Sequence, residues 1–149
     1  MEVLITNRQN LYLLSEESIK STAYALLEKL GKTGAELSLL IVDDEQIAQI
    51  NKTYLGRTGP TNVIAFPMGE TGFTPLQPEL LGDVVISVET AGREASEGGY
   101  SMEERFTELL IHGILHLLGY DHETNEQDAE QMNKKSDELI NYLKARKKQ

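Results

Sequence analysis

All three histidines of this 149-residue chain fall within eleven positions, His112–His122. Residues four apart on an α-helix differ by about 40° in direction and about 6 Å along the axis. His112 and His116 can therefore point their imidazoles at one site. His122 can join them only if the chain turns after His116, because a continuing helix would carry it off that face. Gly119 stands where such a turn is needed, and glycine readily adopts the left-handed conformation of a helix end.

Three imidazoles that leave one coordination position open are typical of a catalytic zinc ion. The spacing H-x-x-x-H-x-x-G-x-x-H is also the metal-binding pattern of the metzincin peptidases. Those peptidases carry their general base, a glutamate, directly after the first histidine, whereas this chain has Gly113 there. The alternative of three packed histidines without a metal leaves both the spacing and the glycine unexplained. We therefore predict one Zn²⁺ per chain on His112, His116 and His122.

Composition limits the classes of protein that this chain can belong to. The absence of cysteine excludes disulfides and thiolate metal ligands. The length, with 40% hydrophobic and 26% charged residues, predicts a single domain over residues 1–149. The net charge of −10 argues against indiscriminate nucleic-acid binding. The acidic excess is uneven, since residues 1–122 hold eighteen acids and eight bases while residues 123–149 hold six of each.

The sequence also predicts where the protein resides. The N-terminal segment, Met1–Asn7, has no basic region followed by a long apolar run, so we expect no signal peptide. No apolar stretch approaches the roughly 18 residues of a membrane span. We therefore expect a cytoplasmic protein without a membrane partner.

Apolar periodicity and turn residues predict four strands and five helices. The strands are expected at residues 3–5, 37–42, 63–66 and 84–86. The helices are expected to begin at five N-capping residues, namely Ser15, Asp43, Ser87, Ser101 and Thr124. Residues 67–81 are predicted to form a long loop, and loops of that length are often functional. Strands and helices alternate and helices close the chain, which predicts an α+β domain with one four-stranded mixed sheet.

Three segments resemble sequence motifs of the YbeY family, bacterial endoribonucleases of rRNA maturation. The segment His112–His122 resembles the family's histidine signature. Pro60–Pro67 resembles its P-T-N/D-V-L-S-F-P strand, and Leu81–Ser87 resembles its L-G-D-I-V-I-S strand. With the order of the helices, the resemblance covers nearly the whole chain, and three motifs in this order are highly specific.

The resemblance implies a zinc-dependent, single-strand-specific endoribonuclease that acts in late 16S rRNA 3′-end maturation and in ribosome quality control. Its partner would be rRNA within ribosomal particles, with no DNA and no membrane. Many members carry an arginine after the aromatic residue that ends the second helix, where this chain has Tyr54 followed by Leu55. Many also have an aspartate at the position of Thr58. Arg57 is the candidate catalytic residue for the missing positive charge, and the alternative is an exposed loop arginine.

The chemistry of RNA hydrolysis fits a site without a protein nucleophile, because RNA carries its own 2′-OH. A metal can polarise a phosphoryl oxygen or lower the pKa of its bound water toward about 7. Asp121 can orient a ligating imidazole or simply end the turn. Besides the endoribonuclease, two functions stay open: a metallopeptidase with a relocated base, and a non-catalytic ribosome-assembly factor with a structural metal.

The segment Pro60–Pro67 should form a strand at the edge of the sheet, beside the metal cleft. Its two prolines lack the amide hydrogens that pairing inside a sheet uses. We expect Thr61 and Asn62 to face the cleft, and the free edge of the backbone to hold an extended ligand.

Overall fold

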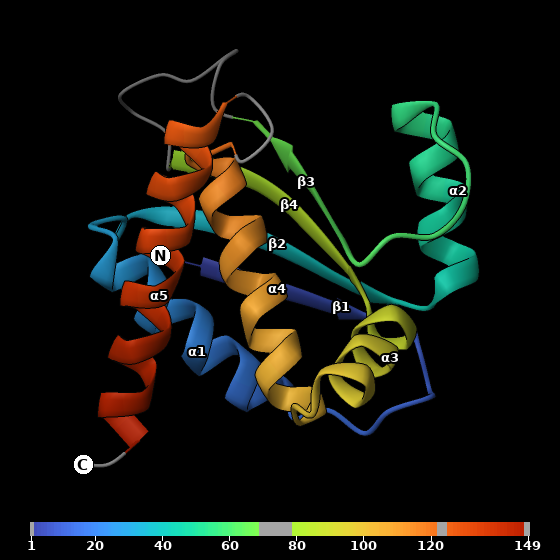
Figure 1. Cartoon of the computed structure of the whole chain (residues 1–149), viewed down its shortest axis with the longest axis horizontal. Coiled ribbons are helices and arrows are strands. Elements are labelled where there is room, and N and C mark those ends of the chain that lie inside the picture. The colour runs from blue at the N-terminus through green and yellow to red at the C-terminus, as the bar shows by residue number, and fades with distance from the viewer. Residues whose placement is uncertain (1, 69–78, 122–124, 148–149) are drawn as a thin grey trace.

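A four-stranded mixed sheet organises the chain in the computed structural model, which describes residues 2–68, 79–121 and 125–147 (Figure 1). The strands are β1 (Glu2–Asn7), β2 (Ala35–Val42), β3 (Val63–Pro67) and β4 (Glu79–Ser87). The helices are α1 (Glu16–Lys29), α2 (Asp44–Leu55), α3 (Val88–Gly98), α4 (Met102–Leu117) and α5 (Glu126–Lys147). The strand order is β1-β2-β4-β3, in which only β3 runs antiparallel to its neighbour. The predicted α+β class with a four-stranded mixed sheet is confirmed.

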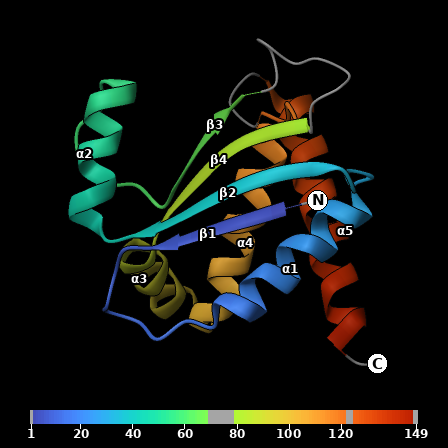
Figure 2. The ribbon, with the colours of Figure 1, turned by 180° about the vertical axis from the view of Figure 1, so that it is seen from behind.

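The two faces of the sheet are covered unequally (Figures 1 and 2). One face packs against α1, α3, α4 and α5 in the larger core, whose strand residues include Val3, Leu37, Leu39, Val84 and Ile86. On the other face, α2 covers a smaller cluster of four buried residues, namely Val42, Ile47, Ile64 and Val85. The larger core fixes α4, the helix that carries His112 and His116.

None of the helices in the described ranges is long and apolar enough to cross a membrane.

The helices begin at side chains that accept hydrogen bonds from the first turn, as predicted for four of the five. Those four N-caps are Ser15, Asp43, Ser87 and Ser101. For α5 the structure differs, because the Asn125 side chain accepts from the Asp128 amide at 2.8 Å. Asn125 is a good N-cap residue in its own right, and Thr124 lies outside the described residues.

The connection between β3 and β4 is shorter than the predicted loop over residues 67–81. Strand β3 includes Pro67, and β4 already begins at Glu79. Its first residues pair with β2, Glu79 opposite Ala35 and Leu80 opposite Glu36. This pairing joins segments more than forty residues apart, so local turn signals did not reveal it. Residues 69–78 of the predicted loop lie outside the described ranges.

Candidate functional site

Helix α4 divides its residues between the core and a partly exposed stripe. Its buried side includes Phe106, Leu109, Leu110, Ile114 and Leu115. The stripe consists of four residues at steps of three, four and four, which are Arg105, Glu108, His112 and His116. Residues at these steps lie on one side of a helix. The two histidines that the sequence singled out therefore lie on one accessible side of α4.

Gly113, the residue after His112, packs against the sheet in a way that leaves no room for a glutamate side chain. A Cβ atom on Gly113 would lie 2.6 Å from Val84 Cγ1 and 3.4 Å from Val63 Cγ2. Real Cβ atoms essentially never approach another atom to 2.6 Å, so α4 lies closer to β4 than a side chain at position 113 would allow. A glutamate here would point between the helix and the sheet, where a charged group is strongly disfavoured. The metzincin base thus has no place at position 113.

The predicted turn after the histidine helix is present. Helix α4 ends at Leu117, and Gly119 has the left-handed φ of 98°. The Gly119 amide donates to the His116 carbonyl at 3.0 Å, and the Tyr120 amide donates to the Leu115 carbonyl at 3.0 Å. These bonds close the helix end in the way that glycine favours. The chain therefore changes direction immediately before His122, which lies outside the described residues.

The metal site can be judged for two of its three predicted ligands. Within residues 2–68, 79–121 and 125–147, no group of three or more His, Cys, Asp or Glu side chains is arranged to hold a metal ion. His112 and His116 are one helical turn apart on the same stripe, and imidazole nitrogen suits Zn²⁺. Asp121 is exposed after the turn. The donors that the structure describes therefore fit a zinc ion, with His122 as the third ligand still a prediction.

Strand β3 lies at the edge of the sheet, as predicted for Pro60–Pro67, and packs against α4 where Val63 meets Gly113. The Asn62 side chain, which we expect to face the histidine cleft, donates to the Glu94 carboxylate of α3 at 3.2 and 3.3 Å. Glu94 in turn accepts from the Arg105 guanidinium at 3.0 Å. This network ties the start of β3 to the α4 stripe. Its members are far apart in the sequence, so local sequence patterns do not reveal it.

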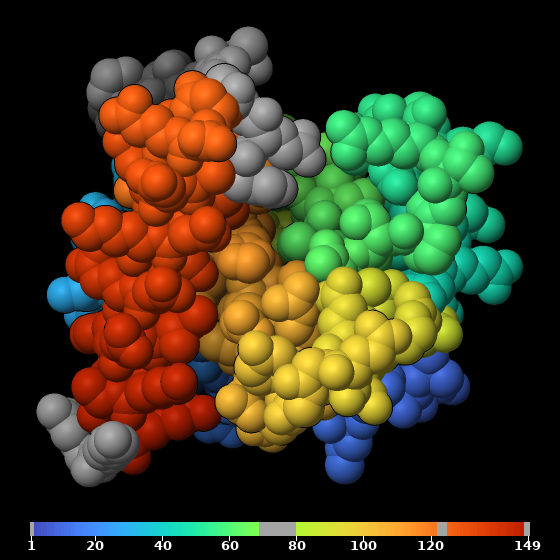
Figure 3. Space-filling view, viewed as in Figure 1, coloured from blue at the N-terminus to red at the C-terminus, as the bar shows by residue number. Residues whose placement is uncertain are grey.

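Arg57 lies in the connection from α2 to β3. In Figure 1 this connection and α2 stand on the far side of β3 from α4, and Figure 3 shows α4 recessed between α5 and this segment. Arg57 and its neighbours Tyr54, Leu55 and Thr58 are exposed. The Tyr54 ring makes an edge contact with Phe66 of β3, with centroids 5.7 Å apart. Arg57 is therefore an exposed residue of the connection between α2 and β3.

A second polar cluster lies where β2 and β4 end and α2 and α3 begin. Asp44 Oδ1 accepts hydrogen bonds from the hydroxyls of Ser87 and Thr90, each at 2.6 Å, and Oδ2 accepts from Arg93 at 3.0 Å. Burial raises the pKa of Asp44, but these hydrogen bonds and the charge of Arg93 outweigh it, so the net pKa is lowered. We name Asp44, Ser87, Thr90 and Arg93 the Asp44 cluster. Its internal bonding suits it to hold α2 and α3 together.

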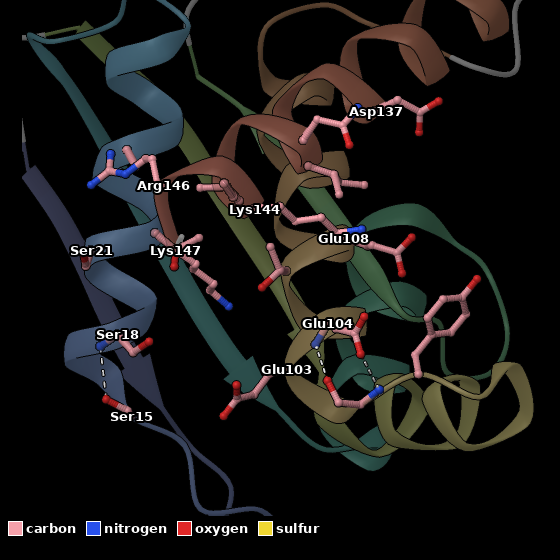
Figure 4. Close-up of a pocket in the computed structure, with 18 of the residues that line it drawn as sticks. Ser15, Ser18, Ser21, Glu103, Glu104, Glu108, Asp137, Lys144, Arg146 and Lys147 are labelled. Atoms are coloured by element: carbon pink, nitrogen blue, oxygen red, sulfur yellow. Dashed lines mark hydrogen bonds between the residues drawn. The ribbon is translucent and has the colours of Figure 1, made fainter. Parts of the chain in front are cut away.

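A cavity of about 1100 Å³ opens between α1, the N-terminal half of α4 and the C-terminal half of α5 (Figure 4). It lies at the opposite end of α4 from the histidines. Hydrogen bonds with Ser101 lower the pKa of Glu104, and the positive charges of Lys144 and Lys147 add to this effect. The charged lining carries both signs, with Glu17, Glu103, Glu104, Glu108 and Asp137 beside Lys144, Arg146 and Lys147. Acids outnumber bases, so this cavity does not favour a polyanion.

Comparison with known proteins defines the family. Residues 4–144 match the family model described as Endoribonuclease YbeY. Endoribonuclease YbeY of Geobacter sulfurreducens is 44% identical over 144 residues, 96% of each chain. Endoribonuclease YbeY of Syntrophotalea carbinolica is 48% identical over 137 residues, 91% of each chain. The chain belongs to the YbeY endoribonuclease family.

A solved structure supports the fold independently. The solution structure of TM1509 from Thermotoga maritima superposes with a TM-score of 0.63 at 23% sequence identity. The match covers 97% of this chain and 93% of that one. At this identity the likeness concerns the fold alone.

Proposed function

We propose that this protein is a zinc-dependent endoribonuclease that cleaves single-stranded rRNA. The observation that carries the proposal is the pair His112 and His116 on the accessible stripe of α4, followed at once by the Gly119 turn. With His122 as third ligand, they would hold Zn²⁺ and leave one position open. Relatives over nearly the full chain bear the name endoribonuclease. The resemblance further supports action in the cytoplasm on the 3′ end of 16S rRNA and in ribosome quality control.

The residues around this site have distinct parts in the proposed reaction. Zinc, when bound, supplies electrophilic stabilisation of the phosphoryl group or an activated water. The exposed guanidinium of Arg57 can bind a phosphate through paired N–H donors. In the described part of the chain, no strand pairs with the outer edge of β3, so its backbone can hold an extended strand of RNA.

The structure weighs against the peptidase alternative. Amide hydrolysis by a zinc peptidase requires a base that activates water, and Gly113 occupies its usual position. Packing of Gly113 against Val84 leaves no room for the side chain. A non-catalytic assembly factor would bind the metal but would not cleave RNA. A cleavage assay therefore distinguishes it from the endoribonuclease.

The charge of the protein indicates how the substrate is selected. At −10 overall, the chain should bind naked single-stranded RNA weakly, because phosphate contacts from Lys and Arg supply most non-specific affinity. We therefore propose that rRNA is presented within a ribosomal particle, to which the protein docks.

The test incubates zinc-replete protein with immature ribosomal particles, with naked RNA of the same sequence and with an unfolded protein. His116→Ala serves as the control for contaminating nucleases. We expect cleavage in single-stranded segments of particle-bound 16S rRNA, weaker cleavage of naked RNA, no proteolysis, and no activity of the variant. Proteolysis would favour the peptidase, and no cleavage of any substrate would favour the assembly factor. Equal cleavage by His116→Ala would contradict the proposed site.

A further inference from the structure

Asn51 is a buried polar residue at a position that an apolar side chain would normally fill. It follows Ile47 by one turn of α2, and it is 5% exposed. The same side of the helix packs on the smaller core cluster of Val42, Ile47, Ile64 and Val85. Asparagine is a weaker helix former than leucine, and a buried amide loses its hydration unless it is hydrogen-bonded. The residue at 51 is therefore not the one that would best stabilise α2.

The hydrogen bonds of Asn51 go to the connection that carries Arg57. Its side-chain Nδ2 donates to the Gly59 carbonyl at 3.0 Å. Its backbone carbonyl accepts from the Arg57 amide at 3.3 Å. Its Oδ1 is buried and has no hydrogen-bond partner among the described residues. The side-chain hydrogen bond of Asn51 in the described part of the chain therefore goes to the connection between α2 and β3.

These two bonds, together with the bond from the Gly56 amide to the Lys52 carbonyl at 3.2 Å, hold an exposed segment that contains two glycines. Gly56 and Gly59 both have left-handed φ, 65° and 93°, and glycine gives the backbone many alternative conformations. Arg57 and Thr58 lie between these glycines and are exposed. Asn51 therefore fixes an exposed, glycine-rich segment, residues 56–60, at two points on either side of Thr58. We name this segment the arginine loop.

We propose that Asn51 is a positioning residue that fixes the backbone of the arginine loop, so that Arg57 is presented to an RNA phosphate in one conformation. The proposal rests on the proposed function of Arg57 as a phosphate ligand. A loop that is fixed before binding avoids the entropy loss that a mobile loop suffers on binding. Loss of the clamp should therefore weaken RNA binding more than it slows the chemical step.

The clamp itself can be tested without nuclease activity. Trypsin cleaves the Arg57–Thr58 bond only when the arginine loop opens, so the cleavage rate reports loop opening. Because one hydrogen bond is lost, we expect Asn51→Ala to accelerate this cleavage about tenfold. Asn51→Asp keeps the shape of the side chain but removes its N–H donor, so it should also accelerate cleavage. It replaces Asn51→Ala if that variant does not fold.

Two controls separate loop opening from general loss of stability. Ile47→Val weakens the same helix without touching the arginine loop, and cleavage after Lys32 reports opening elsewhere in the same sample. We expect Ile47→Val to leave the ratio of cleavage after Arg57 to cleavage after Lys32 unchanged. In Asn51→Ala and Asn51→Asp, this ratio should rise. Equal rates at Arg57–Thr58 in wild type and Asn51→Asp, or parallel acceleration at both bonds, would overturn the clamp.

The link to RNA is tested by a double-mutant cycle on the particle substrate. We expect Asn51→Ala to raise KM about fivefold with kcat within twofold, and to change KM less than twofold when Arg57 is already alanine. An equal effect of Asn51→Ala in both backgrounds would overturn action through Arg57. If wild type cleaves no RNA, the proposed function fails by itself, while the trypsin comparison still decides the clamp.

Discussion

The Asp44 cluster and the α4 stripe are both polar regions next to the sheet, yet their surroundings differ. In the Asp44 cluster, both oxygens of one carboxylate accept short hydrogen bonds from side chains of β4 and α3. On the α4 stripe, His112 and His116 remain partly exposed beside a turn that changes the direction of the chain. The side chains of the Asp44 cluster bond to one another and so hold elements together, whereas two partly exposed imidazoles one helical turn apart have the spacing that a metal ligand pair requires. The first region should therefore control stability and the second activity.

The largest effect is expected from the α4 stripe. His112→Ala should lower RNA cleavage by about two orders of magnitude, because one of three proposed zinc ligands is lost. Without metal, His112→Ala and wild type should have nearly the same midpoint of urea unfolding. Asp44→Ala is the matched control, which should cleave RNA at nearly the wild-type rate wherever it is folded. Wild-type cleavage by His112→Ala together with lost cleavage by folded Asp44→Ala would show that the α4 stripe does not control activity.

A smaller effect, on stability, is expected from the Asp44 cluster. Asp44→Ala removes three charge-assisted hydrogen bonds and leaves the buried Ser87 hydroxyl without its acceptor. We expect the free energy of unfolding to fall by about 2–3 kcal/mol. Urea denaturation at neutral pH measures this change. A loss below about 0.5 kcal/mol, the usual range for surface substitutions, would make the cluster an ordinary surface feature.

The same cluster should give stability a defined pH dependence. The pKa of Asp44 is lower in the folded protein than its ordinary value of 3.8. Its contribution is therefore fully present above the ordinary value and is lost as the pH falls through the lowered folded value. The stability difference between wild type and Asp44→Asn should shrink over that acidic range. A difference that grows on acidification would show that the sign of the shift is wrong.

The close approach of α4 to the sheet should make Gly113 sensitive to a single methyl group. Gly113→Ala places a Cβ 2.6 Å from Val84 Cγ1, and we expect a loss of about 1–2 kcal/mol in the free energy of unfolding. Val84→Ala makes room, so the double variant should lose less than the sum of the two single losses. Additive losses would mean that the contact does not limit residue 113.

The smallest effect is expected from Arg57, which is exposed in the connection between α2 and β3. Arg57→Ala should lower cleavage of particle-bound rRNA about tenfold, since one charged phosphate contact is lost. Zinc content should not change, and Arg57→Lys should restore part of the rate. The exposed Arg8, in the segment after β1, provides a matched control. Equal rates for Arg57→Ala and Arg8→Ala would leave Arg57 as a surface arginine.

Local signals in the sequence were enough to predict the histidine helix and its end. The Ser101–Glu104 capping box is formed in both directions, and Gly119 has the expected positive φ. Such features depend on residues within one or two turns of each other, so spacing alone reveals them. Metal binding by His112 and His116 nevertheless stays a prediction.

Contacts between distant segments could not be read from the sequence. Ser87 and Thr90 reach Asp44 because β2 and β4 are neighbours in the sheet, and sequence separations of 43 and 46 residues hide this. The pairing of Asn62 with Glu94 has the same origin.

The most direct test of the central claim measures zinc in purified protein. Wild type, His112→Ala, His116→Ala, His122→Ala and Asp44→Ala are prepared without chelators and analysed for metal per chain. We predict about one zinc ion per chain in wild type and Asp44→Ala, because three ligands suffice for a catalytic site. The three histidine variants should contain almost none. Equal zinc in wild type and His116→Ala would contradict the account.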